Sequence, residues 1–273
     1  MNLIRTLKSL FDGYITASFH VALAVVAMTK ITVIEFSIIL PKEILVFIFC
    51  ATLVGYNFIK FKDLLVAKGF YTTSLSMIAL CTLVCIPICI AILFSAPLPL
   101  FFLSLLAGSI VVIYAIPLSQ TGRNFRSQSG AKMYLVALAW ILFTLGIPLI
   151  YYKEPFSVTI LLMGLVQFIY VVAAIIPFDI HDRECDDADL RTFPLQMGVK
   201  ESKWLALLPL GVSIFVLVFW SAFSSAFVLA GILSFTILGF CIWKTHEGQS
   251  FYLTRFWIEG IPLLWWAFMV LFS

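Results

Sequence analysis

Two long stretches of the chain, residues 69–122 and 204–243, contain no Asp, Glu, Lys or Arg. A bilayer core of about 30 Å is crossed by roughly 20 helical residues, so each stretch is long enough for two membrane spans. The whole chain is 63% hydrophobic and only 11% charged, which is more apolar surface than a water-soluble domain of this length buries. The sequence therefore predicts an all-α, polytopic helical bundle in a membrane.

Prolines, turn residues and charged segments divide the chain into about nine predicted transmembrane helices. Two prolines in Ser95-Ala-Pro-Leu-Pro99 end one helix and begin the next, and the uncharged turn 221–225 makes a second tight connection. The predicted spans are residues 14–34, 41–58, 71–95, 98–118, 133–152, 156–177, 204–221, 223–243 and 255–272. We expect residues 1–273 to form a single integral-membrane domain.

The distribution of basic residues predicts the orientation of the bundle. With the N-terminus in the cytoplasm, 14 of the 17 Lys and Arg residues fall in cytoplasmic segments. An excess of Lys and Arg is typical of cytoplasmic loops, so the segments 57–70, 120–132 and 178–203 are expected to face the cytoplasm, with a bacterial inner membrane as the expected location. These loops account for the net charge of +3, and no nucleic-acid-binding signature accompanies it.

One acidic segment stands out from this apolar background. The stretch Asp179-Ile-His-Asp-Arg-Glu-Cys-Asp-Asp-Ala-Asp189 holds six of the 14 acidic residues. Asp179, Asp182 and Asp186 have the spacing i, i+3, i+7, which places three carboxylates on one face of a helix. Like charges repel at this spacing, so helix formation alone does not favour them. A hard cation such as Mg²⁺, held by carboxylates and substrate phosphates, would favour three carboxylates at this spacing.

The acidic segment is followed by Arg191-Thr192 and then by Pro194 and Gly198. A D-x-x-D-x-x-x-D core with this tail resembles the second aspartate-rich motif of the UbiA superfamily of intramembrane prenyltransferases. A further similarity is Tyr114-Ala-Ile-Pro117 before a basic loop, which is similar to the segment after the family's fourth helix. The resemblance implies nine membrane helices around a cytoplasm-facing polar cavity.

The resemblance also implies a chemistry. Members of the family are transferases that move an isoprenoid group from a prenyl diphosphate to a lipophilic or aromatic acceptor, here unidentified, within the membrane lipids. By this resemblance Asp179, Asp182 and Asp186 are the catalytic residues and bind Mg²⁺, and through it the diphosphate. The candidates for direct contact with the diphosphate are Asn57, Lys60, Arg123, Arg126 and Arg191.

The first aspartate motif of the family, N-D-x-x-D-x-x-x-D, is degenerate in this chain. Asn57 matches, but Phe58, Phe61 and Leu65 stand where aspartates are expected. Three hypotheses follow. The enzyme is active with one Mg²⁺ site and a lysine, Lys60 or its neighbour Lys62, supplies the missing positive charge. Alternatively, the chain is a non-catalytic lipid- or diphosphate-binding membrane protein of the same fold, or the acidic segment is a solvated connector whose resemblance is accidental.

Glu259 in the last predicted span is another candidate, because an ionisable residue inside a membrane is a functional candidate by default. Arg255 precedes it by four residues, so an ordinary i, i+4 ion pair is an equal alternative. A secondary transporter would have broken helices and charges near the membrane midplane. The charges of this chain instead gather near one membrane face, which disfavours transport.

Overall fold

The computed structural model describes residues 2–68, 73–115, 131–183 and 192–273. Within these ranges the regular structure is entirely helical and contains no strand. The helices are α1 (Asn2–Thr16), α2 (Phe19–Glu35), α3 (Lys42–Lys68), α4 (Thr73–Ser95), α5 (Leu98–Ala115), α6 (Ala131–Ile141), α7 (Ile147–Tyr152), α8 (Val158–Asp182), α9 (Phe193–Met197), α10 (Val199–Phe219), α11 (Ser225–Lys244) and α12 (Glu259–Phe272). Two π-helical turns, η2 (Leu142–Gly146) and η4 (Leu253–Ile258), continue α6 into α7 and lead into α12.

Eight helical segments of the described chain are long and apolar enough to cross a membrane, and the bent pair α1 and α2 brings the number to nine if it is one span. The π-helical turns lie within two of these segments, Lys132–Tyr152 and Leu253–Phe272. The prediction of a polytopic membrane protein is therefore confirmed at the level of eight to nine apolar helices.

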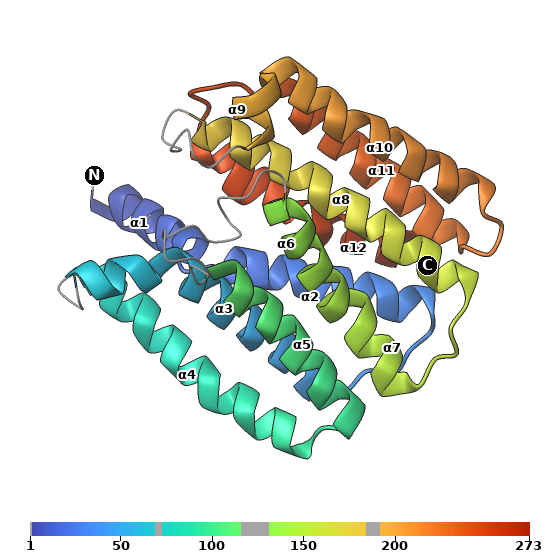
Figure 1. Ribbon diagram of the computed structural model, residues 1–273, viewed down its shortest axis with the longest axis horizontal. Helices are drawn as coiled ribbons and strands as arrows, with labels where there is room; N and C mark the ends of the chain where they lie inside the picture. The colour runs from blue at the N-terminus through green and yellow to red at the C-terminus, as the bar shows by residue number, and fades with distance from the viewer. Residues whose placement is uncertain (1, 69–72, 116–130, 184–191) are drawn as a thin grey trace.

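The helices form a bundle in which neighbours in space are mostly neighbours in sequence (Figure 1). On one side α8, α10, α11 and α12 pack together, and on the other α3, α4 and α5 do so. Helix α2 joins the two groups because it packs against both α12 and α3. Since successive spans run in opposite directions, the ends of α3 and α8 lie at the same end of the bundle as the beginnings of α6 and α12.

Both predicted tight connections are present. Helix α4 ends at Ser95 and α5 begins at Leu98, as the prolines there predict. Helix α11 begins after Ser224, whose hydroxyl accepts a hydrogen bond from the Phe227 backbone N–H at 3.1 Å. The carboxylate of Glu35 accepts two more, from the Ser224 N–H at 3.0 Å and from its hydroxyl at 2.5 Å. This carboxylate cap fixes the start of α11 against the end of α2.

The structure corrects several predicted helix boundaries; α3 continues past the predicted end at 58 to Lys68, for example, and α10 begins at Val199 instead of 204. The first predicted span, 14–34, is not continuous: α1 ends at Thr16, and α2 begins after Ser18, which has a left-handed backbone with φ of 66°. The axes of the two helices differ by 56°. The sixth predicted span ends at 177, but α8 continues through Pro177 to Asp182. Proline is tolerated within membrane helices because neighbouring groups satisfy the freed backbone.

A buried polar chain ties the middle of the bundle together. Thr144 in the π-helical turn η2 donates to Gln167 Oε1 at 2.9 Å, and Gln167 Nε2 donates to the Thr32 hydroxyl at 3.1 Å. All three side chains are fully buried. The chain links α2, η2 and α8, which are the elements around one side of the cavity described next.

Candidate functional site

A cavity of about 890 Å³ lies inside the bundle. Its walls are formed by residues of α1 to α6, η2, α8, η4 and α12, and most of them are apolar. Its charged lining residues are Lys60, Lys132, Asp182, Arg255 and Glu259. They stand near the ends of their spans that share one end of the bundle, so the cavity is charged at one end and apolar over the rest of its length.

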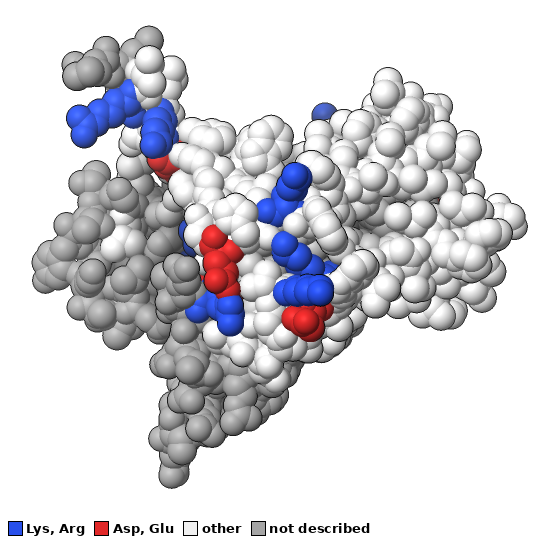
Figure 2. Space-filling model, turned by 90° about the horizontal axis from the view of Figure 1, so that it is seen from above, with Lys and Arg blue, Asp and Glu red and all other residues white. Residues whose placement is uncertain are grey.

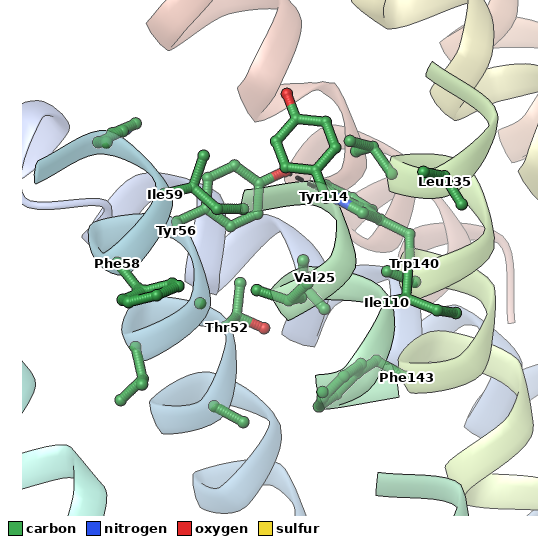
Figure 3. A pocket seen from close by; sticks show the side chains of 18 of the residues that line it. Val25, Thr52, Tyr56, Phe58, Ile59, Ile110, Tyr114, Leu135, Trp140 and Phe143 are labelled. Carbon is green, nitrogen blue, oxygen red and sulfur yellow. Dashed lines mark hydrogen bonds between the residues drawn. The ribbon is translucent and has the colours of Figure 1, made fainter. Parts of the chain in front are cut away.

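Aromatic side chains from three helices converge inside the cavity. Figure 3 shows Tyr56 of α3 and Trp140 of α6 pointing toward each other, with the ring of Tyr114 of α5 beside them and its hydroxyl directed away, and with Phe143 of η2 deeper in the bundle. The Trp140 indole N–H donates a hydrogen bond to the Tyr56 hydroxyl oxygen at 2.9 Å. This bond fixes the two rings relative to each other across the cavity.

The first charged wall, formed by α6 and α8, contains Lys132, Asp179 and Asp182. The Lys132 ammonium donates to Asp179 Oδ1 at 2.8 Å. Asp179 is only 4% exposed, whereas Asp182 borders the cavity. The two aspartates thus differ in role despite their common helix face, because one charge is compensated within the protein and the other is presented to the cavity.

The second charged wall, formed by α3, η4 and α12, contains Lys60, Arg255 and Glu259. All three border the cavity, and both cations interact electrostatically with the Glu259 carboxylate. The Lys60 ammonium donates to the Ser18 hydroxyl at 3.1 Å and lies 5.8 Å from the centre of the Tyr56 ring. The break between α1 and α2 therefore has a direct contact with this wall.

The predicted site residues are distributed as follows. Lys60 and Asp182 border the cavity, and Asp179 lies behind its wall. Asn57 is buried and is not among the lining residues, because its Nδ2 donates to the Thr82 hydroxyl of α4 at 2.9 Å. The remaining predicted site residues, Arg123, Arg126, Asp186 and Arg191, lie outside the described part of the chain.

The donor set bears on the expected Mg²⁺. Among the residues that the structure describes, no group of three or more His, Cys, Asp and Glu is placed to hold a metal ion. Mg²⁺ is usually held by one or two carboxylates together with waters and substrate phosphates. Asp182 fits that arrangement as a cavity-facing oxygen donor, whereas Asp179 already has Lys132 as its partner. The described residues therefore fit an ion held largely by its ligand.

Several cavity residues escaped the sequence analysis as site candidates. Tyr56 and Trp140 carry no motif, and Arg255 was interpreted only as a partner of Glu259. One signal was present for Tyr56, since it precedes Lys60 by four residues and so shares its helix face. No comparable signal connects Trp140 to Tyr56, because the two are 84 positions apart.

Comparison with protein-family models, with curated proteins and with solved structures found no match to this chain. The resemblance of the acidic segment to one family therefore stays a prediction. The cavity and its charged end are the observations from which a function can be argued.

Proposed function

We propose that this protein is a UbiA-like intramembrane prenyltransferase, which moves an isoprenoid group from a prenyl diphosphate to a lipophilic or aromatic acceptor. The observation that carries the proposal is the distribution of lining residues in the 890 Å³ cavity, which is apolar along its length and charged at one end. A prenyl diphosphate has the same pattern, with a long hydrocarbon chain and one polyanionic head. On this proposal the charged end of the bundle faces the cytoplasm.

The cations of the charged end are suited to the diphosphate. Lys60 and Arg255 border the cavity from one wall and Lys132 from the other. Charge-assisted hydrogen bonds to phosphate are stronger than neutral ones, and they strengthen further where water is scarce. When bound, Mg²⁺ would neutralise further charge on the leaving diphosphate, and Asp182 is the described carboxylate that would hold it.

The aromatic residues would act on the next stage of the reaction. As the carbon–oxygen bond breaks, its electron pair leaves with the diphosphate and positive charge develops on the allylic carbon. The faces of Tyr56, Tyr114 and Trp140 border the space next to the charged end, and ring faces attract cations within about 6 Å. The apolar walls would keep water from trapping the cation.

Glu259 is the residue we assign to the acceptor. The acceptor forms a new bond to the allylic carbon and loses a proton, which a carboxylate on the cavity wall can accept. Glu259 borders the cavity between the two cations of the second wall. Its negative charge interacts with both of these cations.

A second candidate function, binding of a prenyl diphosphate without turnover, is favoured by one observation. Phe58, which borders the cavity, stands at a position where the family's first motif has an aspartate. The two candidates differ in one measurable quantity. Membranes that supply the native acceptor should release diphosphate from the bound ligand if the protein is an enzyme, and should release none above a protein-free control if it only binds.

The first test is calorimetric binding of geranylgeranyl diphosphate to the detergent-purified protein with and without Mg²⁺. We expect binding that tightens with Mg²⁺, and we expect Asp182→Asn to remove the Mg²⁺ dependence while the unfolding temperature is unchanged. Glu43→Gln, an exposed carboxylate at the opposite end of the bundle, is the matched control. A folded protein that binds no prenyl diphosphate in either condition would overturn the proposal.

A further inference from the structure

Helix α1 has an apolar face that the protein leaves uncovered. Ile4, Leu7 and Leu10 are 77%, 56% and 65% exposed and are spaced three residues apart, so they share one side of the helix. Arg5 lies on the opposite flank, and Lys8 lies at the edge of the apolar face next to Ile4. By contrast, Ile15 near the end of α1 is only 2% exposed. The helix is therefore anchored at its C-terminal turn and open over its first turns.

The position of α1 identifies what covers this face. Helix α1 lies at the end of the bundle where the charged side chains gather (Figures 1 and 2). Its axis turns by 56° from that of α2. With 15 residues it is too short to cross a bilayer alone. A helix that turns away from a membrane span at the level where the other spans end is placed to reach the boundary between headgroups and acyl chains.

We propose that α1 is an interfacial helix whose Ile4, Leu7 and Leu10 enter the membrane surface while Arg5 and Lys8 contact anionic lipid headgroups. An apolar face next to basic side chains is the pattern of helices that lie in the plane of a membrane. Basic residues near an anionic membrane surface strengthen such binding by electrostatic attraction. A protein partner would also account for the apolar face, but the apolar spans next to α1 place this helix beside the bilayer. This inference does not depend on the proposed prenyltransferase activity.

The contacts of α1 connect it to the cavity. The Tyr252 hydroxyl donates to Asp12 Oδ1 at 2.5 Å, and this bond to the carboxylate raises the pKa of Tyr252. The Phe11 ring packs edge-on against Phe256, with 5.0 Å between the centroids. Both partners belong to the segment that carries Arg255 of the second charged wall. The position of α1 in the membrane surface therefore bears on the geometry of that wall.

Spin labels on the full-length protein in nanodiscs test the proposal. Single cysteines at Leu7→Cys and Leu10→Cys, in a background without the six native cysteines, should be accessible to oxygen and protected from a water-soluble nickel reagent. The matched control Ser9→Cys, exposed on the other side of α1, should show the reverse. Nickel access at all three positions would overturn the proposal, and so would protection from both reagents at Leu7 and Leu10, which would indicate a protein contact.

The headgroup contact needs its own comparison. Hydroxyl-radical footprinting of the unmodified protein should show several-fold less oxidation of Leu7 and Leu10 in nanodiscs with phosphatidylglycerol than in pure phosphatidylcholine. The double variant Arg5→Gln/Lys8→Gln should lose this difference, whereas Lys153→Gln at the opposite end should keep it. Footprints that do not depend on lipid charge in the unmodified protein would overturn the assignment of anionic headgroups to α1. This measurement also applies if the cysteine-free background does not fold.

Discussion

On the cavity wall formed by α6 and α8, Asp179 is nearly enclosed and its charge is compensated by Lys132 at 2.8 Å. On the wall formed by α3 and α12, by contrast, Lys60 and Glu259 both border the cavity. The difference indicates that the Lys132–Asp179 pair and the pair of Lys60 and Glu259 have different roles, although Lys132 and Asp182 of the first wall also border the cavity. Charges compensated inside the protein chiefly determine stability, whereas charges presented to the cavity are available to a ligand.

The largest expected effect is the loss of protein stability when the ion pair of the first wall is broken. Lys132→Ala removes the ammonium that pairs with the nearly buried Asp179 carboxylate, and breaking a buried pair in this way costs about 3–5 kcal/mol. The unfolding temperature of the detergent-purified protein should fall markedly. The double variant Lys132→Ala/Asp179→Asn should recover much of the loss, because both charges of the pair are then removed together.

The matched control for this pair is Arg183→Ala. Arg183 forms an ion pair with Glu247, and the two side chains are 35% and 39% exposed, so both are more than a third exposed. Exposed pairs contribute about 0–1 kcal/mol, so the unfolding temperature should scarcely change. Equal effects of the two substitutions would contradict the distinction between buried and exposed ion pairs at this end of the bundle.

On the second wall the expected effect is on turnover. Glu259→Gln removes the proposed proton acceptor, which typically contributes 10²-fold to 10⁴-fold to a rate, so transfer should fall about 100-fold or more. Binding of the diphosphate should be unchanged or tighter, because Lys60 and Arg255 lose their anionic neighbour. Diphosphate release and calorimetric affinity, measured on the same preparation, separate the two effects. Loss of affinity equal to the loss of turnover would mean that Glu259 only positions the cations.

The difference between the walls also explains what the sequence could predict. Long uncharged segments and paired prolines were enough for the helices and for the turns at 96–97 and 220–224, because these depend on local composition. The Asp179 and Asp182 spacing correctly predicted a shared helix, since α8 continues to Asp182. It did not predict that Lys132 would compensate one of them, because that contact joins residues 47 positions apart.

The second wall was harder to predict for the same reason. Lys60 and Glu259 were separate candidates in the sequence, and only folding brings α3 and α12 to one cavity. The helix break at Ser18 was not predicted, because Ser18 adopts a left-handed backbone conformation that sequence usually indicates by glycine or asparagine. A local sequence motif can therefore indicate the first wall, whereas the second wall forms only when α3 and α12 pack around the same cavity.

Lys60→Ala should weaken binding of geranylgeranyl diphosphate about tenfold or more, since a hydrogen bond to a charged group contributes about 1.5–3 kcal/mol. Lys200→Ala is the matched control, because Lys200 is exposed at the start of α10 and does not border the cavity. Calorimetry in the presence and absence of Mg²⁺ measures both. If the two variants bind alike, the lysine acts only through the general electrostatic field, and the second wall has no specific part in recognising the head of the ligand.

The smallest expected effect concerns how α12, and with it Glu259, is held against α2. A Cβ added at Gly260 would lie 2.9 Å from His20 Nε2. That imidazole cannot easily move, because Nε2–H donates to the Phe256 carbonyl and Nδ1 accepts from the Tyr14 hydroxyl, both at 2.9 Å. Gly260→Ala should therefore destabilise the protein by about 1 kcal/mol, at the low end of the cost of overpacking.

Gly211→Ala provides the control, since no atom lies within 4 Å of a Cβ at that helical position. Alanine is the better helix former there, so the unfolding temperature should stay the same or rise. Gly260→Ala could instead leave the unfolding temperature unchanged, as Gly211→Ala does, and weaken only diphosphate binding by Lys60. The close contact of α12 with His20 would then serve mainly to position the second wall. If Gly260→Ala lowers stability without any change in binding, the position of that wall is fixed by other contacts, and the division between the two walls is less sharp than their geometry indicates.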